Sequence, residues 1–153
     1  MDTVNINWQY IPSSKPGNLT HDQILKAIQT ATAEWNKALT GIVKFTQGDK
    51  NCRVTFLFDH LISKKAEAIA ECREVTKGWE IAFSIKEKWN VGGWRKILGV
   101  GYTLGSTALH EVGHVLDLPH SDDPSFIMFP DYNEQLKLNK KEIVEYRKFL
   151  TDN

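Results

Sequence analysis

The feature that most constrains this chain is a group of histidines in its second half. Three of the five histidines, His110, His114 and His120, fall within eleven positions, in the stretch HEVGHVLDLPH. Residues four apart on a helix share one face, so the imidazoles of His110 and His114 can reach one metal ion at roughly 2.0–2.1 Å. Glu111 projects to one side of this pair, where its carboxylate can act as a general base without binding the metal. The stretch therefore predicts a helix with two ligands and a base.

His120 can complete this site only if the helix ends soon after His114. Two residues favour such an end, because Asp117 can adopt a left-handed conformation and Pro119 cannot continue a helix. Three histidines leave a fourth position open for water, which is typical of catalytic rather than structural zinc. The alternative is an ordinary amphipathic helix with two chance histidines, because H-E-x-x-H is a short pattern.

The order of the predicted elements indicates an α+β domain with helices packed on one sheet. A strand is expected over residues 4–10, and Thr20 with Gln23 fits a capping box that opens a helix. The turn sequence TKGW predicts a hairpin, and Asn139 is a candidate cap for a closing helix. Further strands are expected over 42–45, 53–58, 66–75 and 80–85, and an irregular glycine-rich loop over 89–105.

Charge and hydropathy argue against two classes of partner. Basic and acidic side chains balance at 19 each, so no basic excess of the kind that binds nucleic acid is evident. No apolar run approaches the roughly 20 residues that span a bilayer. The sequence MDTVNINWQY lacks the regions of a signal peptide, so secretion would require a trimmed leader or a non-classical route, and the localisation stays open. We expect no nucleic-acid or membrane partner, and a monomer.

The two cysteines, Cys52 and Cys72, are too few for a disulfide framework. Each lies in a strand-like stretch, so a bridge between neighbouring strands is one interpretation. Two buried free thiols are the interpretation we favour.

The histidine stretch resembles a known pattern. HEVGHVLDLPH matches the metzincin motif H-E-x-x-H-x-x-G-x-x-H at every specified position except the glycine, which is replaced by Asp117. Metzincins also have a Met-turn beneath the metal, for which Met128 in SFIMFP is the candidate. The matrixin branch is similar in detail, because Ser121 directly follows the third histidine and Pro130 lies two residues after Met128. This resemblance is specific over about residues 104–130 and looser elsewhere.

The resemblance implies a metzincin-like α+β fold. It would contain a twisted, mainly parallel sheet of four to five strands, a backing helix, an active-site helix and a small irregular C-terminal lobe with a closing helix. Residues 1–153 would form a single metallopeptidase catalytic domain, with 1–116 as the upper lobe and 117–153 as the lower lobe. The strand near 66–75 would be the sheet edge along which an extended peptide lies, and residues 129–138 would line the pocket for the side chain after the scissile bond.

By the same resemblance, His110, His114 and His120 would bind one catalytic Zn²⁺, Glu111 would be the general base, and Met128 would be structural. The chain would then be a zinc-dependent endopeptidase that hydrolyses extended protein or peptide substrates, with a zinc-bound water as nucleophile. Tyr132 is expected to be a surface or pocket tyrosine rather than a metal-assisting residue.

Two departures from the family shape these expectations. Outside the motif only His21 and His60 remain, too few for the structural zinc of matrixins, so neither that zinc nor calcium is expected. Asp117 could shift the turn and misplace His120, which keeps open a catalytically inactive zinc-binding interaction module. A zinc hydrolase that acts on a non-peptide substrate is a further alternative.

Overall fold

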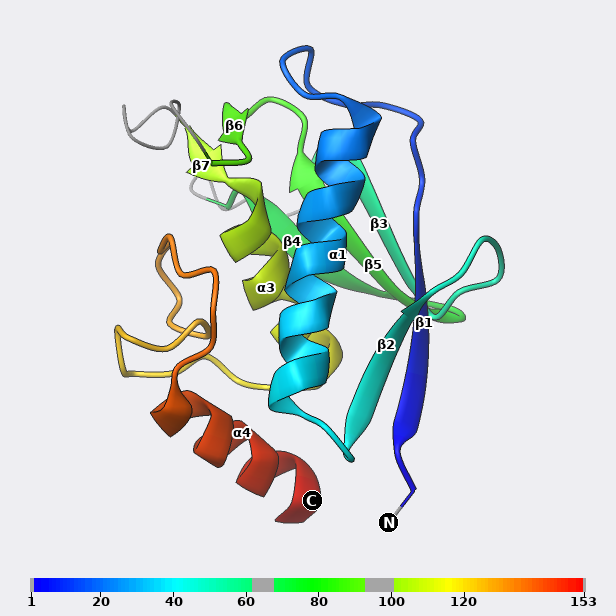
Figure 1. Cartoon of the computed structure of the whole chain (residues 1–153). Helices are drawn as coiled ribbons and strands as arrows, with labels where there is room; N and C mark the ends of the chain where they lie inside the picture. The colour runs from blue at the N-terminus through cyan, green and yellow to red at the C-terminus, as the bar shows by residue number, and fades with distance from the viewer. Residues whose placement is uncertain (1, 62–67, 93–100, 153) are drawn as a thin grey trace.

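The fold is built on one five-stranded sheet. The computed structural model of the chain describes residues 2–61, 68–92 and 101–152 (Figure 1). The strand order is β2-β1-β3-β5-β4, in which β4 pairs antiparallel with β5 and all other pairs are parallel. The predicted mainly parallel sheet is therefore confirmed, with β4 as an antiparallel edge strand. The strands are β1 (Val4–Tyr10), β2 (Val43–Gln47), β3 (Val54–Asp59), β4 (Ala70–Val75) and β5 (Gly78–Ser84).

The predicted strands are present with modest shifts at their ends. β3 shows the clearest alternation, because Val54, Phe56 and Phe58 are buried while the residues between them are partly exposed. The strand predicted over 66–75 begins at Ala70, and residues 66 and 67 lie outside the described part of the chain. The hairpin predicted at TKGW is confirmed, since Val75 pairs with Gly78 across a two-residue turn.

Helix α1 (His21–Ala38) covers one face of the sheet (Figure 1). Its predicted capping box is confirmed, because the Thr20 hydroxyl accepts the Gln23 N–H at 3.1 Å and the Gln23 side chain accepts the Thr20 N–H at 2.9 Å. A side-chain cap of this kind contributes about 1 kcal/mol. The buried side of the helix carries Ile24, Ile28, Ala31, Thr32, Trp35 and Ala38.

Helix α3 (Leu104–Val115) packs beside α1, and α4 (Lys140–Asp152) closes the chain (Figure 1). Trp35 on α1 joins them, since its fully buried indole donates to the backbone oxygen of Leu109 at 2.9 Å and its ring packs against Tyr146 of α4. The core face of α3, which includes Leu104, Ala108, Leu109 and Val112, is buried.

The prediction of an irregular loop over 89–105 is wrong at both ends of that range. β6 (Trp89–Asn90) and β7 (Tyr102–Thr103) pair in parallel, and helix α3 begins already at Leu104. Strands of two residues carry no periodic pattern, so the sequence gives no signal for them. Because β7 runs directly into α3, this pairing fixes where the histidine helix begins. Residues 93–100 of the predicted loop lie outside the described residues.

An ion-pair network holds the edge strand β4 to the rest of the sheet. The Arg73 guanidinium lies 2.9 Å from carboxylate oxygens of Glu71 and Glu80 and 3.4 Å from Asp59. It also donates to the backbone oxygen of His60 at 2.9 Å. Because side chains alternate along a strand, this network lies on the face of β4 opposite Cys72. The edge strand is thus tied to β3 and β5 from its outer face.

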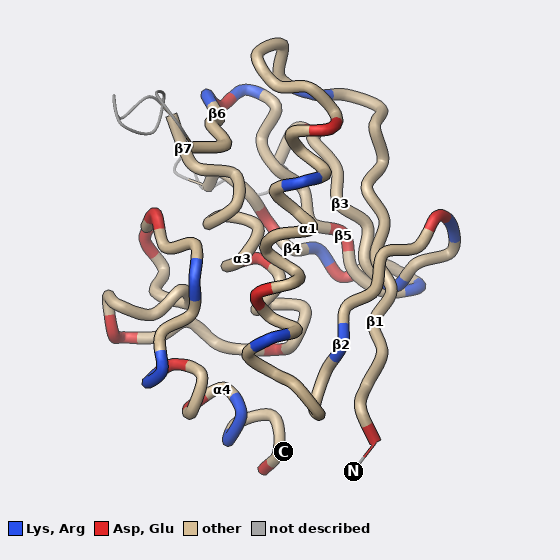
Figure 2. Tube along the Cα trace, in the orientation of Figure 1, with Lys and Arg blue, Asp and Glu red and all other residues tan. Residues whose placement is uncertain are grey.

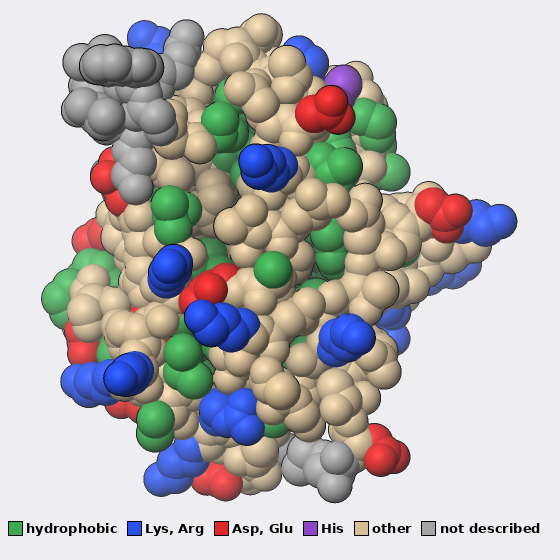
Figure 3. All heavy atoms as spheres, viewed as in Figure 1, with side chains coloured by type: hydrophobic (Ala, Val, Ile, Leu, Met, Phe, Trp, Pro, Cys, Tyr) green, Lys and Arg blue, Asp and Glu red, His purple; other side chains and the backbone are tan. Residues whose placement is uncertain are grey.

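Basic and acidic positions are scattered along the whole chain (Figure 2). On the face shown in Figure 3, lysines and arginines are interspersed with acidic residues. Both cysteines are free, as favoured, but each is partly exposed and not buried as expected, and Cys52 precedes β3 rather than lying in a strand. No helix in the described ranges is sufficiently long and apolar to cross a bilayer.

Candidate active site

The end of α3 determines where the third histidine lies. Asp117 has a φ of 60°, so the left-handed conformation predicted for it is confirmed. The Asp117 N–H donates to the His114 oxygen at 3.0 Å, and the Leu118 N–H donates to the Gly113 oxygen at 3.1 Å. This pair of bonds is the Schellman motif, with Asp117 at the position that glycine usually occupies. The turn that the family makes with glycine is therefore made here with aspartate.

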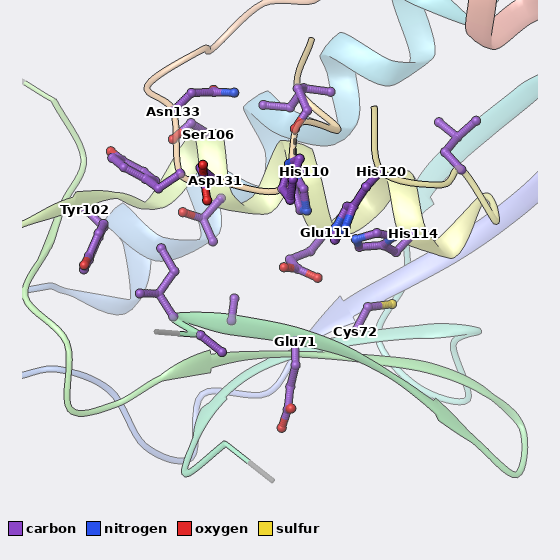
Figure 4. Close-up of a pocket in the computed structure, with 18 of the residues that line it drawn as sticks. Glu71, Cys72, Tyr102, Ser106, His110, Glu111, His114, His120, Asp131 and Asn133 are labelled. Carbon is purple, nitrogen blue, oxygen red and sulfur yellow. Dashed lines mark hydrogen bonds between the residues drawn. The ribbon is translucent and has the colours of Figure 1, made fainter. Parts of the chain in front are cut away.

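The turn brings the three histidines of the motif together (Figure 4). One ring nitrogen from each of His110, His114 and His120 lies within 4.8 Å of the others. In this geometry Asp117 does not displace His120 from the cluster. Three imidazole nitrogens that converge in this way match the donor set of a catalytic zinc site.

The protonation of the two histidines on α3 also suits a metal. The Nδ1–H of His110 donates to the backbone oxygen of Ile127 at 2.6 Å, which leaves its Nε2 free for an ion. Burial, together with the nearby His114 and His120, lowers the pKa of His110 to about 4 despite that hydrogen bond. Burial and His120 also lower the pKa of His114. Both imidazoles are therefore neutral at pH 7, which is the form that binds a metal.

Glu111 lies beside the cluster without belonging to it. Its side chain is largely buried, with the residue only 7% exposed, and its carboxylate points into the space between α3 and β4 (Figure 4). Burial, with a smaller contribution from Glu71, raises the pKa of Glu111 to about 8. A carboxylate whose pKa lies near neutrality is well matched to general-base chemistry.

A cleft of about 1110 Å³ runs past the histidines and Glu111. Residues 68–72, which lead into and begin β4, line one side, and residues 130–133 line the other. Cys72 lies on the cleft side of β4, whereas Glu71 points away from it (Figure 4). Burial, followed by the charges of Glu111 and Asp117, raises the pKa of Cys72 to about 12, so this thiol is protonated at neutral pH.

Tyr132 lines the cleft, as expected of a pocket tyrosine. Its hydroxyl accepts the Thr103 N–H at 2.7 Å, and its ring meets Tyr102 edge-on. This contact joins the loop after Met128 to the start of α3.

Met128 lies beneath the histidine helix, where the Met-turn was predicted. It is fully buried, and a Cβ added to Gly113 would overlap its sulfur atom. The glycine between the two histidines of α3 thus allows this close approach of the methionine. The backbone oxygen of Met128 also accepts the N–H of Ser121, the residue after His120, at 2.9 Å.

Glu142 on α4 is a further residue near the site, and the sequence alone did not indicate it. This residue is fully buried, and its carboxylate accepts the Ile127 N–H at 2.7 Å. Asn139 and Glu142 have the spacing of a capping box, and both bonds of the box are present at 2.8 and 2.9 Å. That spacing would have located Glu142 in the first turn of the helix, but not beside the Met-turn.

The turn at Asp117 gives a stability prediction. We expect Asp117→Val to lower the free energy of unfolding by about 1–2 kcal/mol, because a β-branched residue is strained at positive φ. Asp117→Gly should stay within about 1 kcal/mol of the parent, because relief of strain is offset by the entropy of the unfolded chain. Urea denaturation measures both changes. A valine variant as stable as the glycine variant would contradict the role given to this turn.

The pKa of Glu111 predicts how the zinc-free protein responds to pH. Its pKa of about 8 lies above the ordinary value of 4.5, so the folded state holds a proton that the unfolded state has lost. Stability therefore falls as pH rises between these two values. His110, with a pKa lowered from 6.5 to about 4, gives the opposite trend, but only below about pH 6.5.

The range from pH 6.5 to 8 therefore isolates the contribution of Glu111. We expect the chelator-treated protein to lose on the order of 1–2 kcal/mol of stability across it. Thermal unfolding at both pH values, for the parent and for Glu111→Gln, measures the loss. The stability of the glutamine variant should not change between the two pH values. A parent whose stability is equally unchanged would show that burial does not raise the pKa of Glu111.

The sheet with its antiparallel edge, the backing helix, and the histidine helix followed by a Met-turn define a class of protein. They are the architecture of the metzincin fold.

Comparison with known proteins identifies the family within that class. The family model described as Matrixin matches residues 2–148, and the chain belongs to the matrixin family. It is 29% identical over 134 residues to matrix metalloproteinase-20 of Homo sapiens, which covers 81% of this chain and 25% of that protein. Matrilysin of Felis catus is 36% identical over 72 residues, covering 44% of this chain and 26% of matrilysin.

Neutrophil collagenase of Homo sapiens is 27% identical over 124 residues, which covers 74% of this chain and 25% of the collagenase. The chain thus spans about a quarter of the length of these relatives. Membership of the matrixins supports a metalloprotease kind of function and implies zinc as the metal.

Proposed function

We propose that this protein is a zinc-dependent endopeptidase that cleaves extended protein or peptide substrates. The observation that supports this most is the Glu111 carboxylate, buried beside three converging histidines on the wall of an open cleft. A structural zinc site has no use for such a carboxylate, whereas hydrolysis requires a base. In this proposal residues 1–153 act as one catalytic domain with a single zinc ion.

Each site residue has a distinct role in the proposal. His110, His114 and His120 would hold the ion, and Met128 would support the helix from below without binding the metal. A bound zinc ion would supply Lewis-acid chemistry, which polarises the scissile carbonyl and acidifies water. Glu111 would accept the proton of the attacking water and then deliver it to the nitrogen of the departing amine. Burial suits Glu111 to both steps, because its raised pKa makes proton uptake and release comparable in cost near neutral pH.

The substrate would bind along β4. This strand is last in the sheet order, so its outer edge offers backbone donors and acceptors to an extended peptide. Residues 130–133 face it across the cleft and would contact the side chain that follows the scissile bond. Main-chain hydrogen bonds would then supply affinity, and the pocket would supply preference.

Metal analysis combined with a cleavage assay tests the proposal. The purified protein should contain one zinc per chain and should cleave unfolded casein and members of a quenched fluorescent peptide library. Chelation should remove both properties, and added zinc should restore them. One zinc with no cleavage of any peptide would favour an interaction module, and a native protein that binds no zinc would refute both readings.

A further inference from the structure

We infer that Glu142 is a positioning residue that sets the geometry of two zinc ligands through the backbone of the Met-turn, here residues 126–129. The inference rests on the proposed function, in which the histidines bind zinc. Glu142 itself lies on α4 and is not part of the histidine cluster.

The Glu142 carboxylate connects several segments at one buried point. One oxygen accepts the Ile127 N–H at 2.7 Å and the Tyr146 hydroxyl at 3.2 Å. The other oxygen accepts the Asn139 N–H at 2.8 Å and the side-chain amide of Gln135. Burial of a carboxylate is costly, and hydrogen bonds to a charged acceptor are the strong ones that offset this cost. Ile127 is thus held against a fixed, fully buried acceptor.

The Met-turn in turn holds two of the three histidines in place through backbone hydrogen bonds. The Ile127 oxygen accepts the Nδ1–H of His110 at 2.6 Å, which fixes the rotation and tautomer of that ring. The Met128 oxygen accepts the Ser121 N–H at 2.9 Å and so holds the backbone next to His120. A shift of the Met-turn would therefore move both ligands.

His114 provides an internal contrast. Its ring lies near the backbone of Leu118, in the turn that ends α3, and among the described residues no hydrogen bond joins it to the Met-turn. Loss of the Glu142 anchor should therefore disturb the ligand set unequally, with His110 and His120 affected more than His114.

Glu142 also caps α4, so a purely structural role must be separated from a positioning role. The Asn139 side chain accepts the Glu142 N–H at 2.9 Å and donates to the Ser125 oxygen at 2.9 Å. Asn139→Ala removes both bonds, while the Glu142–Ile127 bond remains available. Loss of an N-cap destabilises a protein by about 0.5–2 kcal/mol without any necessary effect on a distant site. Asn139→Ala is therefore a matched control for helix capping. Glu145→Gln, an exposed change on the same helix, controls for loss of charge.

The experiment uses the full chain and two readouts that do not depend on peptidase activity. Competition with a chromophoric chelator gives the zinc affinity of each folded variant. Nitrogen-15 NMR of the zinc-free protein reports the hydrogen-bonded Nδ1–H of His110. We expect Glu142→Gln to weaken zinc binding roughly 10-fold, which is the lower end of the loss in affinity that follows removal of a group that orients a metal ligand. The same variant should weaken or abolish the His110 Nδ1–H signal. Asn139→Ala should lower the melting temperature but leave zinc affinity and the NMR signal unchanged.

Glu142→Asp keeps the carboxylate but shortens the side chain by one methylene, so its effect on zinc affinity should be smaller. This variant replaces Glu142→Gln in the experiment if the glutamine variant does not fold. Zinc affinity within twofold of the parent, with an unchanged His110 signal, would overturn the inference. A parent chain that binds no zinc would refute the proposed function, and the NMR comparison in the zinc-free protein would still decide whether Glu142 orients His110.

Discussion

Replacement of Glu111 by glutamine is expected to lower kcat/KM for peptide cleavage by about 10²–10⁴-fold while leaving the zinc content unchanged. The amide has nearly the same shape as the carboxylate but cannot accept the proton of an attacking water. Since Glu111 does not belong to the histidine cluster, the metal should stay in place. The loss should appear in kcat with little change in KM, because Glu111 acts on the reacting water and not on peptide binding.

Steady-state cleavage of a fluorescent peptide, combined with metal analysis of the same samples, measures this effect. Glu145→Gln on the exposed side of α4 is the control and should match the parent. Glu111→Ala should resemble Glu111→Gln in rate if the proton acceptor is what has been lost. Undiminished cleavage by either Glu111 variant would remove the residue from the mechanism.

The second large effect is expected for His120→Ala, which should weaken zinc binding by more than about 100-fold. Loss of a ligand should exceed the 10–100-fold cost of losing a group that merely orients one. The variant would keep His110 and His114 on α3, but two imidazoles from one helix face leave the ion with half of a tetrahedral set. Cleavage should fall with the zinc content.

Chelator competition and metal analysis at matched protein concentration test this expectation. His60→Ala is the matched control, because His60 is exposed and lies outside the cluster. It should bind zinc as the parent does. Equal affinity in the His120 and His60 variants would mean that the third ligand comes from another residue, and the assignment of His120 would be wrong.

Sequence reasoning succeeded where the determinant is local. The capping box of Thr20 and Gln23, the hairpin at residues 76–77 and the left-handed Asp117 each depend on a few neighbouring residues, and each is present. The spacing of His110 and His114 predicted that they share a helix face for the same reason. Among the strands, alternation identified β3 within one residue at each end, since one side of it is fully buried.

The remaining features depend on contacts between distant segments. Nothing near Glu142 in the sequence shows that its carboxylate will meet Ile127, because that contact requires α4 to dock beneath the Met-turn. The sequence also gives no signal for the pairing of β6 with β7, since this pairing joins residues 13 apart through strands of two residues. Arg73 appears in the sequence as an ordinary strand residue, and only the arrangement of β3, β4 and β5 brings three carboxylates around it.

The close spacing of the site residues along the chain also bears on the order of assembly. The proposed ligands, base, Met-turn and anchor all fall between residues 110 and 142, and successive proposed ligands are only four and six residues apart. Short loops of this kind close at little entropic cost, whereas the pairing of β1 with β3 joins residues 46 positions apart. The helix that carries two of the ligands can form early and locally. The segment that carries the proposed ligands therefore contributes little to the chain-closure entropy of folding, and most of that cost falls on the sheet.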